Sequence, residues 1–418
     1  MKTGRQSKFF FIGFSMIVLL GLGLVSVSKL PSIQVKASQA LTWVHGALHP
    51  KGSLPTAETG DTKAAAQTPF WLPDVMGTQT ESGGATEVVQ TKQASTPLPA
   101  ATILPVPAFD PKHDYQDWNN CGPATLALAL RYWGWLGDQF TISEVIRPKR
   151  QDKNVNIDEL AGYVNASAAG LQAEVRVGGS QALLERLIAG GYPVVIEESF
   201  RVEKPAWPGD DQWAGHYLLL TGYDEQSQFF TAQDSYYGPD RLTPFTDLEK
   251  NWQAFNHVYL VIFPKSDLQK VQTLLAADWP TDANLTRTAA ALQGQLQFDP
   301  GNAFAWFNLG STLTAERDYA SSALAFDRAR ALGLPSRMLR YQFGPFIAAY
   351  QTGNQKDLAR LADYALQVTP DSEEALLWKG WAYDLAGDHL NAIALFNQAL
   401  QAHPNYVEAE KALAIVRP

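Results

Sequence analysis

The chain has 418 residues, of which 46% are hydrophobic and 12 are tryptophan, so it is long enough for two or three domains with apolar cores. Its formal net charge of −9 argues against the strongly basic surfaces that bind nucleic acid. It holds one cysteine, so no internal disulfide can stabilise the fold.

Residues 1–30 have the pattern of an export signal or membrane anchor. Residues 9–28 carry no charge, follow Lys2, Arg5 and Lys8, and as a helix would cross the bilayer core of about 30 Å. The apolar stretch exceeds the ~7–15 residues usual in a cleaved signal, which favours an uncleaved anchor. The positive charges place the N-terminus inside, so the later domains are expected outside the cytoplasm, or secreted if the segment is cleaved.

Residues 31–105 are predicted to be a flexible linker. From about residue 39 onward they are rich in Ala, Thr, Ser, Gly, Gln and Pro and show little periodicity. Such a composition buries too little apolar surface to offset the entropy of ordering the chain.

Residues 106–264 have the pattern of a mixed domain. Helical patterns follow Cys121 and recur near residues 157–168 and 181–189. Short runs rich in Val, Tyr, Phe or Ile, bounded by Gly, Pro or Asp, predict strands at 174–177, 193–199, 217–223, 229–233 and 257–263. Helices first and antiparallel strands later predict an α+β fold.

Residues 300–418 contain a helical repeat. Prolines at 300, 335, 370 and 404 are spaced by 35, 35 and 34 residues. The first and last units resemble the tetratricopeptide pattern, and the middle one is degenerate. The residues that carry this resemblance are Trp306, Leu309, Gly310, Phe326 and Ala329, and then Gly380, Tyr383, Ala392, Phe396, Ala399 and Pro404. The resemblance implies a protein partner, and residues 265–299 are expected to be a helical connector or a divergent repeat.

Cys121 is the strongest candidate for chemistry because of its position. It lies where a loop runs into an apolar helix, and Pro123 suits the first helical turn. The unpaired N–H groups and the dipole of a helix N-terminus favour thiolate over thiol. The alternative for a lone cysteine is a small core hydrophobe.

A nucleophilic cysteine needs a base and a group that orients the base. His216 opens the strongest strand pattern, and His113 and His257 are the rival bases. A hairpin after this strand should bring Asp234 opposite Tyr217 or Leu218, next to His216, whereas Asp224 would lie about 26 Å away. The expected catalytic set is therefore Cys121 as nucleophile, His216 as base and Asp234 as the group that orients it.

Gln116 lies five residues before the cysteine. Its amide and the backbone N–H of Cys121 are candidate donors to an oxyanion. The alternative is an ordinary surface glutamine in a loop.

These motifs together resemble a known group. Gln116, Asn120-Cys121-Gly122-Pro123-Ala124, Gly215-His216-Tyr217 and Asp234-Ser235 are similar to the papain-like cysteine peptidases related to the bacteriocin-processing, double-glycine-leader peptidase domain. The resemblance covers about residues 106–264 and implies the same catalytic roles on an α+β fold. Exporter-linked members also carry a membrane domain and a G-x-x-x-x-G-K-[ST] loop, and this sequence shows neither.

The sequence therefore predicts a membrane-anchored, extracytoplasmic cysteine peptidase that acts on a peptide or protein substrate. The alternative is a catalytically altered papain-like module, for binding or for acyl transfer, on a tetratricopeptide scaffold. One cysteine and scattered histidines give no metal-ligand spacing, so neither a metal nor another cofactor is expected.

Overall fold

The computed structural model describes residues 31–48, 54–56, 97–149 and 154–416. Helix α2 (Pro31–Leu48) and the loop 204–210 group as one compact unit, and the other described residues form a second. The anchor predicted at residues 1–30 lies outside the described residues. Within the described ranges, no helix combines the length and apolarity that crossing a membrane requires.

A seven-stranded sheet forms the centre of the domain after the linker, and all of its paired strands are antiparallel. Its strands follow the order β2-β7-β3-β4-β5-β6, and β1 pairs with β4. The strands are β1 (Ala101–Ile103), β2 (Leu171–Arg176), β3 (Val194–Arg201), β4 (Trp213–Asp224), β5 (Phe229–Asp234), β6 (Gly238–Pro244) and β7 (Tyr259–Pro264). The predicted antiparallel arrangement is confirmed.

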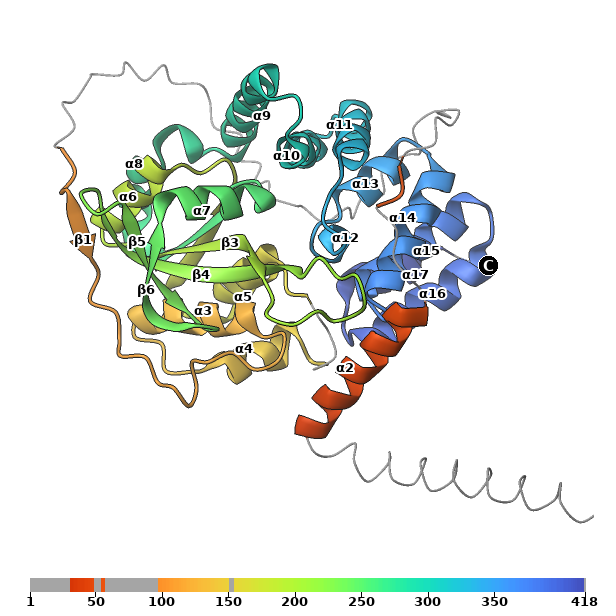
Figure 1. Ribbon diagram of the computed structural model, residues 1–418, viewed down its shortest axis with the longest axis horizontal. Helices are drawn as coiled ribbons and strands as arrows, with labels where there is room; N and C mark the ends of the chain where they lie inside the picture. The colour runs from red at the N-terminus through yellow and green to blue at the C-terminus, as the bar shows by residue number, and fades with distance from the viewer. Residues whose placement is uncertain (1–30, 49–53, 57–96, 150–153, 417–418) are drawn as a thin grey trace, which may run out of the picture. The chain divides into compact units, whose positions relative to one another are not determined.

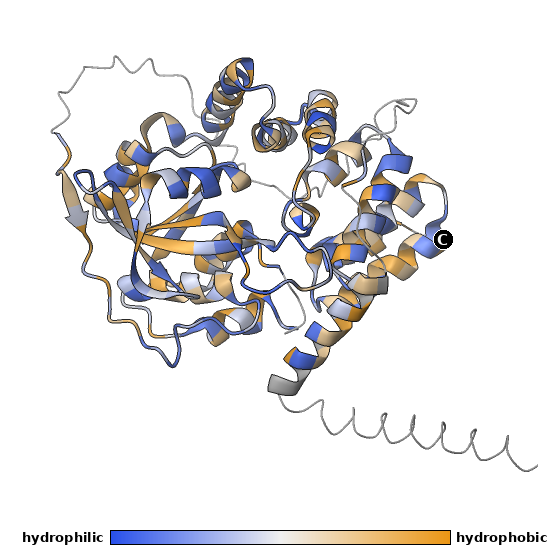
Figure 2. Ribbon diagram, in the orientation of Figure 1, coloured by the Kyte–Doolittle hydropathy of each residue, from blue (hydrophilic) through white to orange (hydrophobic). Residues whose placement is uncertain are grey.

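Helices cover both faces of the sheet (Figure 1). On one face lie α3 (Cys121–Tyr132), α4 (Gln139–Ile146) and α5 (Ile157–Ser167), and on the other lie α6 (Gln181–Ala189), α7 (Phe245–Trp252) and α8 (Leu268–Leu275). Tyr217 and Leu219 of β4 belong to the first core, and Leu218 and Leu220 belong to the second. Burial on both faces explains the three successive leucines of β4, and orange stretches lie among the strands of the sheet in Figure 2.

The structure differs from the sequence expectation at several segments. The predicted linker contains α2 and β1, so it is not irregular throughout. Strand β6 was not predicted because it is a polar edge strand, Gly-Pro-Asp-Arg-Leu-Thr-Pro, and prolines are tolerated at edges.

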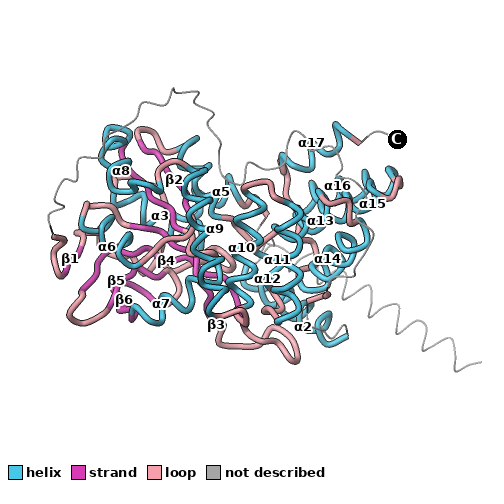
Figure 3. The backbone as a smooth tube through the Cα atoms, turned by 90° about the horizontal axis from the view of Figure 1, so that it is seen from above, coloured by secondary structure: helices cyan, strands magenta, loops and turns pink. Residues whose placement is uncertain are grey.

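The described chain from Thr281 onward is drawn as helices and loops (Figure 3). Asp318, Asn354 and Asp388 each begin a helix by accepting a hydrogen bond from the backbone N–H three residues later. The helices are α9 (Thr281–Phe298), α10 (Ala303–Ala315), α11 (Tyr319–Leu332), α12 (Met338–Tyr341), α13 (Gly344–Gln351), α14 (Gln355–Val368), α15 (Glu373–Leu385), α16 (His389–Ala402) and α17 (Val407–Ile415).

The repeat of about 35 residues in the helical region is explained by how its successive helices pack. A Cβ atom on Gly310 in α10 would lie 2.7 Å from ring atoms of Phe326 in α11, and Gly380 lies against Phe396 in the same way. Each glycine therefore lets two successive helices approach closely. The middle unit has Pro345 at the equivalent position, which agrees with its degenerate sequence.

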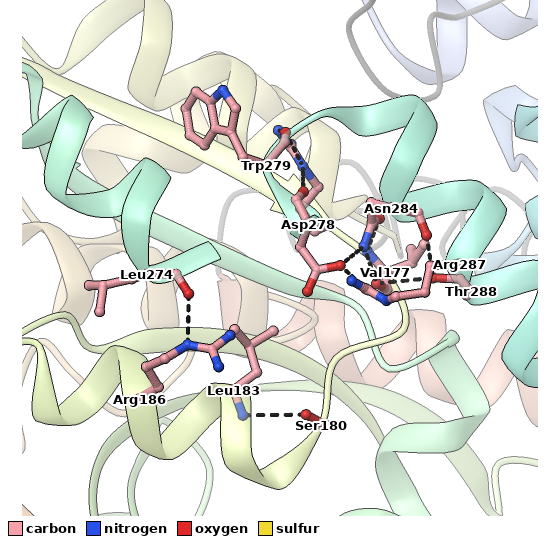
Figure 4. Close-up of polar contacts among 11 residues, drawn as sticks. Val177, Ser180, Leu183, Arg186, Leu274, Asp278, Trp279, Asn284, Arg287 and Thr288 are labelled. Atoms are coloured by element: carbon pink, nitrogen blue, oxygen red, sulfur yellow. Dashed lines mark hydrogen bonds and ion pairs between the residues drawn. The ribbon is translucent and has the colours of Figure 1, made fainter. Parts of the chain in front are cut away.

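The predicted connector 265–299 divides between the two regions. Val271 and Leu275 of α8 pack into the core of the sheet domain, whereas Leu292 of α9 packs against the helical region. Asn284, at the start of α9, donates to the carbonyl of Val177 at 2.9 Å and accepts from its N–H at 3.2 Å (Figure 4). Residues 265–299 therefore connect the two regions and are hydrogen-bonded to the sheet domain. They do not form a separate helix pair.

The helical region also contacts the strand that carries the predicted base. The guanidinium of Arg337 donates to the carbonyl of Trp213, the first residue of β4, at 2.7 Å. The Trp213 ring stacks on Phe255, at 5.7 Å and an interplanar angle of 10°, and meets Tyr341 edge-on. The start of β4 is thus held by side chains from outside the sheet.

Candidate active site

Cys121 is the first residue of α3, as the sequence predicted. Its sulfur accepts a hydrogen bond from the backbone N–H of Gly122, one of the donors that a helix N-terminus leaves unpaired. The preceding loop is fixed because the Asn120 side chain donates to Gln139 Oε1 at 2.7 Å. A Cβ atom on Gly122 would touch Leu160, Val155 and Tyr217 at 3.4 Å, so this turn of α3 packs tightly on the sheet.

The hairpin of β4 and β5 brings His216 and Asp234 together. The last ladder pair is Leu219 with Gln233, so the next step places Asp234 beside Leu218, one of the two predicted positions. The imidazole Nε2 of His216 lies 2.9 Å from Oδ1 of Asp234. His216 is in the interior of β4 rather than at its start, because β4 begins at Trp213.

The thiol of Cys121 interacts with the imidazole of His216 closely enough for each group to shift the pKa of the other. Since Nε2 is engaged by Asp234, Nδ1 is the ring nitrogen that remains for the thiol. Phe200 covers the imidazole, with ring centroids 5.0 Å apart, and His216 is 1% exposed. The fold therefore brings the three predicted side chains together.

The electrostatic interactions among Cys121, His216 and Asp234 favour an ion pair between the thiol and the imidazole. Burial of the thiol works against ionisation, but the hydrogen bond and the charge of His216 outweigh it and lower the pKa of Cys121. Burial likewise disfavours the imidazolium, but Asp234 and Cys121 outweigh it and raise the pKa of His216 to about 10. Both shifts favour the thiolate and imidazolium over the thiol and neutral imidazole.

Asp234 is held ionised by four donors. Its Oδ1 accepts from His216 and from the backbone N–H groups of Tyr236 (2.7 Å) and Tyr237 (3.2 Å), and its Oδ2 accepts from Arg241 at 2.6 Å. Burial opposes ionisation, yet the bonds and charge of His216, with those of Tyr236 and Arg241, lower the pKa of Asp234 to about 2.

Gln116 lies beside this carboxylate. Its backbone N–H donates to the carbonyl of Ser235 at 2.8 Å, and its Oε1 accepts from the Ser235 hydroxyl at 3.1 Å. The second bond engages the side chain by its oxygen, which leaves the amide N–H groups available as donors.

Two acidic residues of β3 lie at the site and were not predicted. Glu197 is buried, is hydrogen-bonded to Tyr217, and interacts electrostatically with Cys121. Burial raises its pKa well above the usual range, so the carboxyl is neutral and does not repel the thiolate. Tyr217 in turn donates to the carbonyl of Val155 at 2.9 Å, which ties β4 to the loop before α5.

Glu198 is the cross-strand partner of His216 and is 2% exposed. Burial raises its pKa to about 7, although the charges of His216 and Arg241 partly oppose the rise. The sequence offered a signal for Glu197 and Glu198, because two adjacent acids inside the apolar run Val194–Arg201 are unusual. For Arg241 the signal was weak, since β6 itself was not recognised.

The rival histidines lie elsewhere. His113 Nδ1 pairs with Asp110 Oδ2 at 2.6 Å in the loop before α3, and His257 Nε2 pairs with Glu249 Oε1 at 2.9 Å. Asp224 accepts from the N–H groups of its own turn and is not joined to His216. Across the described ranges, no group of three or more His, Cys, Asp or Glu side chains is arranged to hold a metal ion.

Comparisons with known proteins match part of the chain to a peptidase family. Residues 103–260 match the model of the Peptidase_C39 like family. Three solved structures are similar at low TM-scores. A putative C39-like peptidase from Bacillus anthracis has 17% identity and a TM-score of 0.31, covering 40% of this chain and 98% of its own.

The second is MamA, with 16% identity, a TM-score of 0.30, and coverage of 34% and 82%. The third is a double glycine motif protease from an AMS/PCAT transporter in complex with the leader peptide, with 17% identity, a TM-score of 0.28, and coverage of 39% and 95%. No curated protein matches the chain. The match to the Peptidase_C39 like family thus covers most of the residues of the antiparallel sheet, and a helical region follows them.

Proposed function

We propose that the C39-like domain is a cysteine peptidase that hydrolyses peptide bonds with Cys121, His216 and Asp234. The observation that carries this proposal is that the thiol of Cys121 interacts with His216, whose imidazole lies 2.9 Å from a carboxylate that is itself held by Arg241. The family match over residues 103–260 supports the same reaction class.

In this mechanism the thiolate of Cys121 attacks the carbonyl carbon of the scissile bond. The imidazolium of His216 then gives its proton to the leaving amine as the C–N bond breaks, which leaves an acyl-enzyme and a neutral imidazole. His216 next removes a proton from water, the water oxygen attacks the thioester, and the thiolate leaves. Asp234 stays ionised throughout and holds the imidazole in place.

The negative oxygen formed at each attack needs donors. The amide of Gln116 and the backbone N–H of Cys121, at the first position of α3, are the proposed pair. Removing one such donor typically lowers kcat by about 10²–10³-fold. Gln116→Glu keeps the size of the side chain and replaces the donor by an acceptor, so it should reduce turnover without abolishing labelling of the thiol.

The test compares Cys121→Ala, His216→Ala and His257→Ala in the full chain. Cys121→Ala should abolish reaction with a thiol-directed electrophile and hydrolysis of peptide substrates, because Cys121 is the only cysteine. His216→Ala should slow both reactions strongly. His257→Ala is the matched control, since its imidazole pairs with Glu249 away from the thiol. Peptide hydrolysis that survives Cys121→Ala would remove the peptidase proposal.

The helical region, residues 300–418, is proposed to be a tetratricopeptide-type stack that binds a protein partner. The capped helix starts at Asp318, Asn354 and Asp388, and the contact of Gly310 with Phe326 that Gly380 and Phe396 repeat, support this assignment.

Residues 1–30 are proposed to anchor the protein in the membrane with the domains outside the cytoplasm. This proposal rests on the sequence alone, namely the uncharged residues 9–28 behind Lys2, Arg5 and Lys8. Cell fractionation combined with protease added to intact cells tests it. Full protection from the protease, or recovery only in the cytosol, would contradict it.

A further inference from the structure

Between α2 and Pro97, the structure describes a single short segment, Leu54, Pro55 and Thr56. It belongs to the predicted linker, is neither helix nor strand, and is drawn as a short orange-red trace near α14 in Figure 1. Leu54 is 1% exposed and ranks among the largest fully buried side chains of the protein. A leucine buried this completely in a region of linker composition indicates a specific docking site.

Two arginines of the helical region hold the backbone of this segment. Arg330 on α11 donates from Nη1 to the carbonyl of Pro55 at 3.0 Å, and Arg360 on α14 donates from Nη2 to the carbonyl of Thr56 at 2.8 Å. Backbone carbonyls are common to every peptide, so these contacts recognise an extended chain rather than particular side chains. The buried Leu54 adds the preference for an apolar residue, and Pro55 keeps the chain extended.

The binding arginine is positioned by the helices themselves. Arg330 is 3% exposed and forms a two-pronged ion pair with Asp357 of α14, with Nη1 to Oδ1 at 3.0 Å and Nη2 to Oδ2 at 2.8 Å. It also pairs with Asp327 one turn earlier on α11. A buried guanidinium fixed by two carboxylates, with one N–H aimed at a peptide carbonyl, is a preorganised donor.

We propose that α11 and α14 form a binding site for an extended leucine-proline segment of polypeptide, and that residues 54–56 of this chain occupy it in cis. Because site and segment belong to one chain, the segment has an effective concentration of about millimolar. It therefore closes the site to competing peptides and docks the linker on the helical region. This inference does not depend on the proposed peptidase activity.

The test measures binding of a fluorescently labelled peptide with the sequence of residues 49–61, His-Pro-Lys-Gly-Ser-Leu-Pro-Thr-Ala-Glu-Thr-Gly-Asp, to the full chain. In the wild type the internal segment occupies the site, so the peptide should bind weakly. Leu54→Asp would place a carboxylate at a position that is 1% exposed, and this should vacate the site. The peptide should then bind at least about tenfold more tightly, if its intrinsic Kd is about 100 µM or below.

Three controls make the result specific. Leu324→Asp changes a leucine of α11 that is 72% exposed, and it should bind like the wild type. Arg360→Ala added to Leu54→Asp should weaken peptide binding, because the donor to Thr56 is lost. A peptide carrying Asp in place of Leu54 should not bind either protein. Leu54→Ala provides a milder variant with the same expected direction if Leu54→Asp does not fold.

Hydrogen exchange supplies a second measurement. Release of the segment should speed exchange in α11 and α14 in Leu54→Asp relative to the wild type, and leave β4 unchanged. Equal peptide binding by the wild type and Leu54→Asp, or no binding by either, would overturn the proposal. Unchanged exchange in α11 and α14 would also overturn it.

Discussion

The replacement Asp234→Asn probes the link between the carboxylate and the reactivity of the thiol. Asparagine has the size of aspartate but no charge, and its amide nitrogen cannot accept. Its single oxygen can face either His216 Nε2 or the guanidinium of Arg241, but not both as the carboxylate does. The imidazolium then loses its charged partner while remaining buried.

The expected shift in the pKa of His216 follows from the loss of its hydrogen bond to the charged carboxylate of Asp234. A charge-assisted hydrogen bond of this kind contributes about 1.5–3 kcal/mol. At about 1.36 kcal/mol for each pKa unit, the pKa of His216 should fall by about one to two units from its value of about 10. With a weaker imidazolium beside it, the thiol pKa rises, so the reactive ion pair begins to form only at a higher pH and exists over a narrower pH range.

The assay is the rate of Cys121 labelling by an uncharged electrophile as a function of pH. In the wild type the rate should stay nearly constant well below the range of a free thiol, about pH 8.5. In Asp234→Asn the fall in rate should move to higher pH by about one unit or more, which is about a tenfold slower reaction on the acidic side. Asp224→Asn is the matched control, because Asp224 belongs to the same hairpin and only accepts bonds from its own turn. An unchanged profile in Asp234→Asn would refute this reasoning.

Three further predictions concern stability. The pKa of Asp234 is lowered from 3.8 to about 2, so its ionised form stabilises the fold by about 2 kcal/mol above pH 3.8, and this is lost as the pH falls through about 2. Asp234→Asn should therefore lose less stability than the wild type between neutral pH and pH 2 in denaturant titrations, and an equal loss would contradict the assignment. Gly310→Ala should cost about 1–3 kcal/mol by overpacking against Phe326, whereas Gly294→Ala in α9, where a Cβ meets nothing within 4 Å, should be neutral or stabilising in thermal melts. Asn284→Ala should cost about 1–3 kcal/mol because the backbone groups of Val177 lose their partners, and an unchanged melting temperature would show that α9 is not needed to hold this edge of the sheet.

The parts of the site that the sequence predicted are those set by local chemistry. Cys121 was predicted at a helix start because Pro123 and an apolar run follow it, and α3 begins there. Asp234 was preferred over Asp224 because the length of one hairpin determines which carboxylate returns to His216, and the ladder agrees to within one residue. Both inferences used contacts close in sequence.

The parts that were missed depend on contacts distant in sequence or on weak local patterns. Arg241 lies on a polar edge strand, and only the β5–β6 register brings it to Asp234. The role of Glu197 depends on pairing with Tyr217 across the sheet. Residues 54–56 have linker composition, and only the arginines of α11 and α14, hundreds of residues later, give them a position. The amino-acid composition of a segment indicates how flexible it is by itself, but it does not predict contacts with residues far away in the sequence.

The most direct test of the proposed catalytic set is an ultraviolet absorbance titration of the thiolate in the full chain, with Cys121→Ala as the blank. The signal is unambiguous because the sequence holds one cysteine. A thiolate that in the wild type is present below the ordinary cysteine range of about pH 8.5, and that in His216→Ala appears only near that range, is the predicted result. A wild-type thiol that itself titrates near pH 8.5, unchanged by His216→Ala, would contradict the account.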